Sequence, residues 1–470
     1  MRTHPSEAFT LWGAAHEHGG VSGRFVAGAA ARLPLNEMLN GSVLDGRGEE
    51  LRGRSVLIAT RDQFLASMAL IELDGIARRI VLYPPDLPFE LLPAVIEAAS
   101  VDAVVADRSA MGPQVPRVQY FLPYAREIVP QQCDRSVQVA TEWILLTSGT
   151  LGIPKLVVHN LASLAGAINR ENPAAPNVVW STFYDIRRYG GLQVLLRALA
   201  GGTLLISSGE RALPELLSQA GAAGATHVTG TASHWRSVLM SGAAARIAPR
   251  YVRLSGEVAD QGILDALCSA YPRALIAHAF ASTEAGVAFE VQDRLAGFPA
   301  DWAGAGPAPG GVAQLRIVDG SLRVRSAGTA MRYVGESAPP LRDAEGFVDT
   351  GDRVQLRAGR YYFLGRGGGI INVGGLKVHP EEVEAVINAH PWVRLSRVRS
   401  RRSPITGAVV AAEVVRAEQG SGAVPTDAEL SAQLVERCRE LLAPHKVPAM
   451  VQIVPSLPLS PAGKLVRPDA

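Results

Sequence analysis

Short hydrophobic runs alternate with segments of helical periodicity in the first part of the chain. Residues 55–60 and 79–83 have the length and aliphatic character of buried strands, and a third such run covers residues 102–106. Between these runs, residues 64–73 and 91–100 place their apolar side chains at the spacing of a helix. Strands that alternate with helices predict a parallel α/β sheet with helices on both of its faces.

The middle of the chain continues this pattern with further runs of strand length, at residues 143–146, 202–206, 226–229 and 251–254. Between residues 310 and 365 the pattern changes to short β runs separated by glycine turns, which indicates a small antiparallel unit. We therefore predict an α/β fold with a large N-terminal domain, made of α/β subdomains plus this small β unit.

A domain boundary is predicted at the glycine-rich segment 365–369, because three consecutive glycines leave the backbone free to rotate. Beyond it the pattern indicates three further elements, a helix at 380–389, a strand at 408–415 and a helix at 427–442. These elements are enough for one small domain. We therefore predict an N-terminal domain at residues 1–365 and a small mobile α+β C-terminal domain at residues 366–470.

Composition narrows the class of protein. Hydrophobic residues make up 47% of the 470 residues and charged residues 19%, which excludes a disordered chain. The net charge of +2 gives no basis for electrostatic binding of nucleic acid. No secretion signal and no long apolar run is present, so we expect no membrane attachment. The isolated Cys133, Cys268 and Cys438 form no zinc or disulfide pattern, which is typical of the reducing cytosol, and we predict a cytoplasmic protein.

Lysine is rare, so each of its positions is informative. Only four of the 46 basic residues are lysines: Lys155, Lys377, Lys446 and Lys464. Arginine can supply a generic surface charge, whereas a compact ammonium on a flexible stem requires lysine. The four lysines are therefore candidates for functional positions, and the alternative is that they are chance survivors.

The strongest local signal is the segment Leu146–Lys155, in which hydroxyl residues and glycines follow a predicted strand and end in Pro154 and a lysine. Glycines allow backbone N–H groups to converge on phosphate oxygens, hydroxyls add donors, and the ammonium neutralises charge. The order of the residues is not that of the Walker A motif, which disfavours a P-loop ATPase. Taken alone, the segment is equally compatible with a polar turn.

Several motifs together resemble those of the adenylate-forming superfamily, which includes acyl- and aryl-CoA ligases, peptide-synthetase adenylation domains and firefly luciferase. Thr147–Lys155 resembles its phosphate loop. Further motifs follow in the family's order: Ser255-Gly256-Glu257, Phe280–Glu284, Asp349–Asp352, Gly365-Arg366, Asn372–Glu384 and Pro458–Arg467. The resemblance covers nearly the whole chain. It implies an ATP-dependent acid–thiol ligase that activates an acyl or aryl acid as acyl-AMP with release of pyrophosphate, and then transfers it to the thiol of CoA.

The resemblance also implies roles for individual residues. The resemblance implies that Thr147, Ser148, Thr150 and Lys155 hold the leaving phosphates, and that Ser255, Gly256 and Glu257 end a strand beside adenine. Phe280 stands where the family has an aromatic residue beside adenine, Asp352 would accept both ribose hydroxyls, and Arg366 would contact ribose or phosphate. Gly149 and Ala281 are the remaining implied nucleotide-binding residues. Three residues are the implied catalytic ones. Thr283 would donate to the α-phosphate, Glu284 would hold Mg²⁺, and Lys464 would bridge the substrate carboxylate and the α-phosphate. Because both reactants are anionic, such a reaction depends on positive charge and on positioning.

For the second half-reaction, the resemblance implies that the C-terminal domain rotates and that Gly374 and Gly375 line a passage for the pantetheine arm of CoA. The family usually has Asp or Lys at the pivot, whereas this chain has Gly368, which makes the two orientations less sharply defined. The expected partners are a small carboxylic acid and CoA. A carrier-protein phosphopantetheine acting in trans is the alternative acceptor. A degenerate nucleotide-binding protein without ligase activity is the alternative from another class.

The resemblance places the acid pocket around four segments, but they leave the acid itself open: Phe183–Gly191, His227–Thr231, Ser255-Gly256 and Ala277–Ala281. Arg187 or Arg188 would pair either with a second acidic group of the substrate or with Asp185. Asp185 also follows an aromatic residue, as the amino-group anchor of amino-acid-activating domains does, although its spacing to Gly201 is too long for that family. Neither the pathway nor the oligomeric state is predicted by the sequence.

Overall fold

The computed structural model describes residues 10–13, 23–28, 32–107, 120–123, 127–147, 154–168, 177–206, 212–304, 306, 313–335, 338–366, 369–373, 376–403, 407–417, 424–460 and 464–466. The contacts within the chain divide it into two units. Unit 1 comprises Met1–Val228, Ala281–Ala288 and Arg325–Val348. Unit 2 comprises Thr229–Phe280, Phe289–Val324 and Asp349–Ala470.

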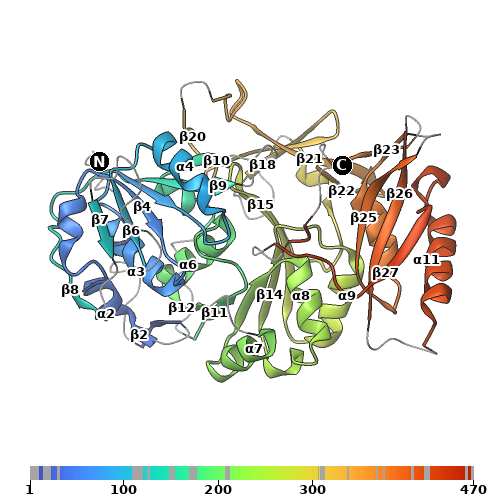
Figure 1. Ribbon diagram of the computed structural model, residues 1–470, viewed down its shortest axis with the longest axis horizontal. Helices are drawn as coiled ribbons and strands as arrows, with labels where there is room; N and C mark the ends of the chain where they lie inside the picture. The colour runs from blue at the N-terminus through green and yellow to red at the C-terminus, as the bar shows by residue number, and fades with distance from the viewer. Residues whose placement is uncertain are drawn as a thin grey trace. The chain divides into compact units, whose positions relative to one another are not determined.

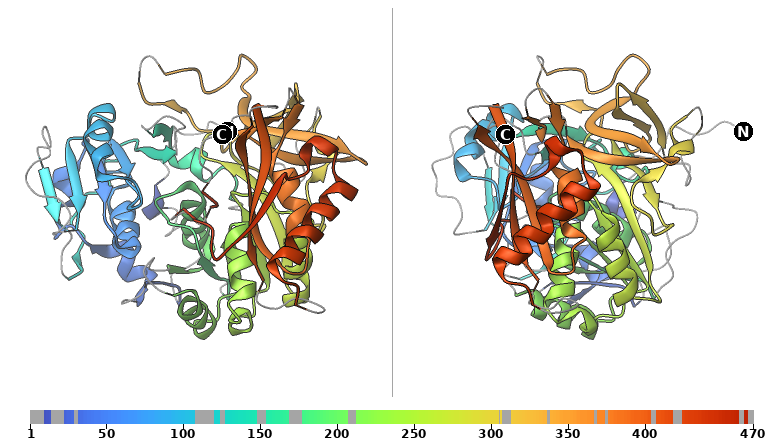
Figure 2. Two further views of the ribbon diagram at one scale, coloured as in Figure 1. Left: turned by 45° about the vertical axis from the view of Figure 1, so that its right-hand side comes forward. Right: turned by 90° about the vertical axis from the view of Figure 1, so that its right-hand side faces the viewer.

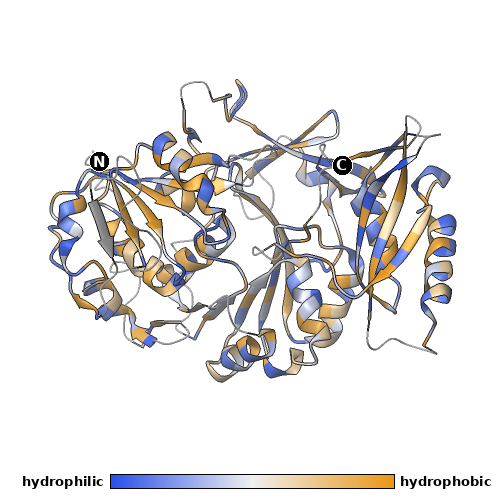
Figure 3. Ribbon diagram, viewed as in Figure 1, coloured by the Kyte–Doolittle hydropathy of each residue, from blue (hydrophilic) through white to orange (hydrophobic). Residues whose placement is uncertain are grey.

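A seven-stranded sheet with the order β20-β10-β9-β5-β4-β6-β7 belongs to unit 1. Its parallel strands are β4 (Ser55–Ala59), β5 (Arg79–Leu82), β6 (Ala103–Ala106), β7 (Tyr120–Pro123) and β9 (Glu142–Thr147). At one edge, β10 (Lys155–His159) runs antiparallel to β9, and β20 (Arg332–Tyr333) runs antiparallel to β10. The strands around β4 are strongly hydrophobic (Figures 1 and 3). The predicted parallel α/β sheet is therefore confirmed.

The predicted helices of this region are α3 (Gln63–Leu73) and α4 (Leu92–Ala98). The carboxylate of Asp62 caps α3, because it accepts hydrogen bonds from the first free N–H groups of the helix. Every residue of α3 except Leu65 is buried, which explains why its apolar positions are not confined to one face. α4 is preceded by a 3₁₀ turn (Phe89–Leu91) and buries its apolar side against the sheet.

Unit 1 contains a second group of strands. β1 (Phe25–Ala27), β11 (Val179–Thr182) and β12 (Thr203–Ile206) are parallel, with β12 in the centre, and β2 (Arg32–Pro34) runs antiparallel to β1. The helix α6 (Tyr189–Gly201) packs on β11 and β12. Smaller elements are α2 (Leu35–Asn40), α5 (Leu161–Leu164), α7 (Leu213–Ala222), and the pair β3 (Gly41–Ser42) and β8 (Val129–Pro130).

Unit 2 begins with the parallel pair β14 (Tyr251–Ser255) and β15 (Leu275–Ser282), which follow β13 (His227–Gly230). The helices α8 (Ala232–Met240) and α9 (Gln261–Ala270) pack against each other, and α8 packs on β14 (Figure 1). A five-stranded sheet has the order β17-β22-β21-β19-β18. Its strands are β17 (Phe298–Pro299), β18 (Ala313–Val318), β19 (Ser321–Ser326), β21 (Val348–Arg357) and β22 (Arg360–Arg366). β22 is antiparallel to both of its neighbours, as predicted for residues 310–365.

The last part of unit 2 is a three-stranded sheet covered by two helices. β25 (Val393–Ser403) is antiparallel to β26 (Gly407–Arg416), and β27 (Met450–Val454) is parallel to β26. The helices α10 (Pro380–Asn388) and α11 (Asp427–Leu441) share one hydrophobic core with these strands (Figure 2). The short hairpin of β23 (Ile371–Val373) and β24 (Leu376–Val378) precedes α10. The predicted helices and the strand at 408–415 are present, whereas β25 and β27 were not predicted. None of the helices among the described residues has both the length and the apolar character needed to cross a bilayer.

Candidate active site

The predicted phosphate-binding residues of unit 1 lie at the end of the β9–β10 hairpin. Thr147 and Lys155 are register partners in this antiparallel pair, so the ladder places them opposite each other where the connecting loop begins and ends. Lys155 is exposed, and its Nζ lies 5.4 Å from the ring centroid of Tyr333 on β20, a distance at which a cation and a ring attract. The other predicted residues of this loop, Ser148, Gly149 and Thr150, lie outside the described residues.

The predicted catalytic residues Thr283 and Glu284 lie in the turn after β15, and both are half-buried. Hydrogen bonds hold the main chain of this turn at two consecutive carbonyls. The Nε2 atom of His159 lies 2.7 Å from the carbonyl oxygen of Thr283, and the N–H of Ala330 donates to the carbonyl of Glu284 at 2.9 Å. The turn that carries the two residues is therefore fastened to β10 and to the segment before β20.

His159 was not singled out by the sequence, although it follows Lys155 by one strand length on β10. Its side chain is fully buried, and burial lowers the pKa of His159 to about 4, so the ring is neutral at physiological pH. A carbonyl accepts only, so Nε2 carries the proton that is donated to Thr283. Nδ1 then accepts from the hydroxyl of Ser163 at 2.9 Å, and the ring packs on Tyr189 with centroids 5.7 Å apart.

Glu284 is suited to the predicted Mg²⁺ contact as a single protein ligand of the ion. Among the described residues, no group of three or more His, Cys, Asp or Glu side chains could hold a metal ion by itself. A half-buried single carboxylate is suited to an ion whose remaining ligands are substrate phosphates and water, and Mg²⁺ is commonly bound in this way. A metal that needs a complete protein cage does not fit these residues.

In unit 2, Asp352 and Arg366 are brought together by the pairing of β21 with β22, in which they are register partners. Arg366 Nε lies 3.5 Å from Asp352 Oδ1, and the Asp352 side chain is 17% exposed while that of Arg366 is 66% exposed. Burial raises the pKa of Asp352, and the charges of Arg366 and Lys464 oppose this increase. The structure thus joins the residues predicted to contact the ribose.

Phe280, the aromatic residue predicted beside adenine, belongs to a cluster of aromatic rings at the end of β15. Its ring is nearly parallel to that of Phe363, with centroids 5.3 Å apart and an interplanar angle of 7°, and it also stacks on Phe289. Phe280 and the adjacent Ala281 are half-buried. The cluster fixes the orientation of the Phe280 ring before any ligand binds.

Gly256 and Lys464 are in contact, although more than two hundred positions separate them in the chain. Gly256 has a φ of +83°, which only glycine adopts readily, and a Cβ placed on it would lie 3.3 Å from Cε and 3.7 Å from Nζ of Lys464. Lys464 itself is exposed. Together with its effect on Asp352, this contact places the last lysine beside two residues that the motifs assigned to the nucleotide.

The carboxylate of Glu257 is bonded to the protein's own donors. It accepts from the N–H of Ser233 at 2.8 Å, from the Ser233 hydroxyl at 3.0 Å and from the N–H of Leu465 at 2.9 Å. The motif implied that the segment Ser255-Gly256-Glu257 lies beside adenine. The preceding Ser255 is half-buried at the end of β14.

The two arginines of the predicted acid pocket are both paired within unit 1. Arg187, 1% exposed, forms an ion pair with Asp185 and donates to the carbonyl of Thr60. Arg188 forms an ion pair with Asp86 and donates to a main-chain carbonyl of β9. For Arg187 the structure therefore supports the pairing with Asp185, whereas Arg188 pairs with Asp86, which the sequence did not indicate.

The predicted hinge is described only in part. Gly365 has a φ of +97°, which favours glycine, and a Cβ on it would displace the carboxylate of Glu381. Gly368, the predicted pivot, and Gly374 and Gly375, the predicted wall of the pantetheine passage, lie outside the described residues.

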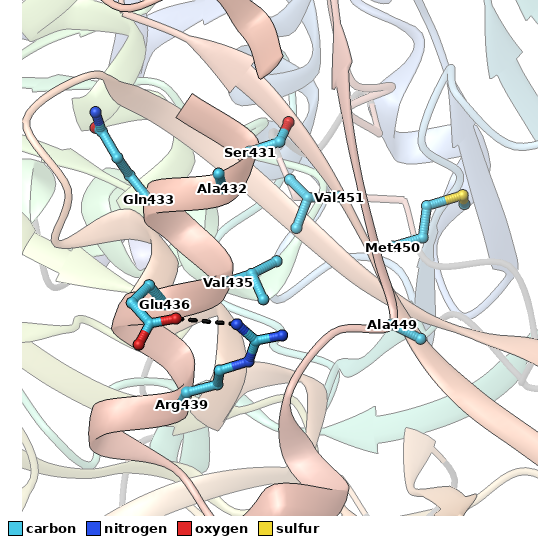
Figure 4. A pocket seen from close by; sticks show the side chains of 9 residues that line it. All are labelled: Ser431, Ala432, Gln433, Val435, Glu436, Arg439, Ala449, Met450 and Val451. Atoms are coloured by element: carbon cyan, nitrogen blue, oxygen red, sulfur yellow. Dashed lines mark hydrogen bonds and ion pairs between the residues drawn. The ribbon is translucent and has the colours of Figure 1, made fainter. Parts of the chain in front are cut away.

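An open groove of about 590 Å³ lies between α11 and the start of β27 (Figure 4). Its side chains come from both elements, and Glu436 and Arg439 form an ion pair at 2.9 Å across one turn of α11. None of the residues that line it was a candidate from the sequence.

Comparisons with known proteins agree with the motifs. The model of a family described as AMP-binding enzyme matches residues 81–334, and that of the AMP-binding enzyme C-terminal domain matches residues 382–464. Over 348 residues the chain is 28% identical to the 2-succinylbenzoate–CoA ligase of Salmonella typhimurium. The aligned region covers 73% of this chain and 72% of that protein.

Solved structures share the fold at low sequence identity. The anthranilate CoA ligase AuaEII in complex with anthranoyl-AMP matches with a TM-score of 0.78 and 15% identity, over 97% of this chain and 96% of that one. The o-succinylbenzoate CoA synthetase from Bacillus subtilis, in complex with its acyl-adenylate intermediate, matches with a TM-score of 0.73 and 20% identity over the same shares. The predicted fold class is thereby confirmed.

Proposed function

The chain belongs to the AMP-binding enzyme family, and from this premise we propose which of its residues carry the reaction. The activity is that of an AMP-forming acyl- or aryl-CoA ligase, with ATP, Mg²⁺ and CoA as the other participants. A carboxylic acid attacks the α-phosphorus of ATP to give acyl-AMP and pyrophosphate. The thiol of CoA then takes the acyl group and releases AMP.

The observation that supports this assignment best is that Lys464 lies against Gly256 and that its charge acts on the carboxylate of Asp352, all within unit 2. These residues come from the end of β14, from β21 and from the last described segment, and no local pattern of sequence relates them. A carboxylate for the ribose and an ammonium for the reacting oxygens are what acid adenylation requires at adjacent positions.

We assign the roles by charge and by mobility. Lys464, on a flexible stem, neutralises the carboxylate and the α-phosphate as they approach, and Asp352 accepts the ribose hydroxyls beside Arg366. In unit 1, Lys155 and Thr147 bind the phosphates that leave, and Thr283 donates to the α-phosphate. When bound, Mg²⁺ neutralises phosphate charge, and Glu284 is the residue that would hold it.

Domain organisation and location follow as part of the same proposal. Residues 1–365 form the nucleotide- and acid-binding domain, and residues 366–470 form a mobile domain whose hinge begins at Gly365, where a φ of +97° favours glycine. The three cysteines are free, which supports a reducing compartment and hence a cytoplasmic enzyme.

Acid-dependent exchange of pyrophosphate into ATP tests the assignment, with a panel of acyl and aryl acids. Lys464→Ala should lower the exchange rate at least about 100-fold, because it removes the charge that joins the two anions. Lys446→Ala is the matched control, since it removes a lysine whose partner Glu382 keeps its ion pair with Arg357. Exchange that does not depend on any acid, or that survives in Lys464→Ala, would refute the assignment.

The acceptor is tested separately by offering either CoA or a carrier protein with a phosphopantetheine arm to the loaded enzyme. We propose CoA, so acyl-CoA should form at the higher rate. If a thioester forms only on the carrier protein, the acceptor is the carrier and not CoA.

A further inference from the structure

The segment that carries Lys464 is folded back on itself. The N–H of Ser460 donates to the carbonyl of Lys464 at 2.6 Å, the N–H of Val466 donates to the carbonyl of Pro458 at 3.0 Å, and Leu459 pairs with Leu465 in an antiparallel bridge. This short pairing sets the local shape of the segment. It does not determine where the segment lies on the rest of unit 2.

Two side chains from other parts of unit 2 fasten the backbone just after Lys464. Glu257 accepts from the N–H of Leu465 at 2.9 Å, and Arg397 Nη1 donates to the carbonyl of Val466 at 3.0 Å. A hydrogen bond between a charged group and the main chain is stronger than one between neutral groups. The two bonds act on consecutive residues, so together they fix both the position and the direction of the chain that follows the lysine.

The side chains of Glu257 and Arg397 each have further hydrogen-bond or ion-pair partners within unit 2, which fix their positions. Ser233, in the first turn of α8, donates to Glu257 through its N–H and through its hydroxyl. Arg397 forms an ion pair with Glu413 on the neighbouring strand β26, in which its Nε donates at 2.8 Å and both side chains are nearly buried. A group held in this way loses little freedom when it makes a further bond, so it can position a neighbour accurately.

We propose that Glu257 and Arg397 are positioning residues for adenylation, which hold the backbone beside Lys464 so that its ammonium reaches the reacting oxygens. The inference rests on the proposed role of Lys464. It gives Glu257, which the motif placed among the nucleotide-binding residues, a role toward the terminal segment. Only the flexible stem of Lys464 then remains to be ordered when the substrates bind.

The inference predicts a specific kinetic pattern. Glu257→Ala and Arg397→Met should each lower kcat of adenylation about 10- to 100-fold, since a displacement of about 1 Å can cost that much. The KM for ATP should change less than about threefold, because neither side chain touches the nucleotide in this reading. Glu257→Gln keeps an acceptor and should recover part of the rate.

Arg399→Met is the matched control. Arg399 pairs with the same Glu413 at 3.1 Å, and the hydrogen bond to the carbonyl of Val466 comes from Arg397. Arg399→Met should therefore leave adenylation near the rate of the unchanged enzyme. If Arg399→Met is as slow as Arg397→Met, the loss of rate comes from disturbing the pairing of β25 with β26, and the inference fails.

A double variant separates this inference from the proposed function. In a Lys464→Ala background, Glu257→Ala should cause no further loss, because a residue that acts only through Lys464 has nothing left to position. A further loss as large as in the unchanged enzyme would overturn the inference, and an increase in KM for ATP would mean that Glu257 acts on the nucleotide instead. If Lys464→Ala is itself fully active, the proposed function fails instead.

Hydrogen exchange gives a readout that needs no activity. In the full-length enzyme, the amide of Leu465 should exchange slowly, and Glu257→Ala should speed its exchange about tenfold or more, with the amides of α11 unchanged. Unchanged exchange at Leu465 would show that the hydrogen bond does not hold the segment in solution, and the inference would be wrong.

Discussion

The carboxylate of Glu72 offers a sharp test of the interior of unit 1. Glu72 lies near the end of α3, and its side chain is 0% exposed. It accepts from the Ser42 hydroxyl at 2.6 Å and from the N–H of Val43 at 3.2 Å, while Arg135 donates to its main-chain oxygen. Burial raises the pKa of Glu72 from 4.5 to about 7, and these hydrogen bonds together with the Arg135 charge offset only part of this increase.

The sign and size of the effect follow from proton linkage. Between pH 4.5 and about 7 the unfolded chain has lost this proton and the folded chain retains it, so stability falls as pH rises through this window. Above about pH 7 both states are ionised, and the full penalty of the buried charge is present. A difference of about 2.5 between the two pKa values corresponds to about 3.5 kcal/mol, since one pKa unit is worth about 1.4 kcal/mol.

The assay compares the unchanged enzyme with Glu72→Gln, which cannot ionise. Pulse proteolysis in urea reports the free energy of unfolding of unit 1 between about pH 5 and about pH 8. The unchanged enzyme should lose about 2.5 kcal/mol more than the variant over this range, whatever the variant's own stability. Glu37→Gln, which alters an exposed carboxylate on α2, is the control. Parallel pH dependences for the unchanged enzyme and Glu72→Gln would refute the reasoning.

Three further predictions concern the proposed active site. His159→Phe should slow pyrophosphate exchange about fivefold or more with little change in the KM for ATP, because the half-buried carbonyl of Thr283 loses its ring N–H donor at a cost of about 1 kcal/mol; an unchanged rate would show that the turn needs no support from β10. Gly256→Ala should lower kcat of adenylation. The φ of +83° at this position costs alanine about 1–2 kcal/mol, and the added Cβ would press on the side chain of Lys464. Full activity of the variant would show that the contact of Gly256 with Lys464 does not matter for adenylation. Asp352→Asn should raise the KM for ATP about tenfold and abolish discrimination against 2′-deoxy-ATP, and a variant that still discriminates would remove Asp352 from the ribose site.

Part of the candidate site could be predicted from the sequence because each motif consists of residues that are close together in the chain. The hydroxyl and glycine segment before Lys155, the rare lysines and the acidic residues of β21 stand out by type and spacing alone. The length and hydrophobic composition of their segments likewise identified β4, β5 and α3, which are buried on nearly all sides. Such features need only the residues that are neighbours in the chain.

Tertiary structure decided what depends on a partner far away in the chain. β25 was missed because its alternate arginines read as a polar segment, and they are accommodated only because Arg397 and Arg399 share Glu413 on β26. His159 gains a role only when β10 lies beside the turn after β15.

The pairing of Glu257 with the amide of Leu465 joins residues 208 positions apart. A hydrogen bond has a reach of about 3 Å, so no spacing in the sequence can encode that two such distant groups will meet. The sequence determined which chemical groups are present and the local elements that carry them. The packing of those elements decided which groups act together.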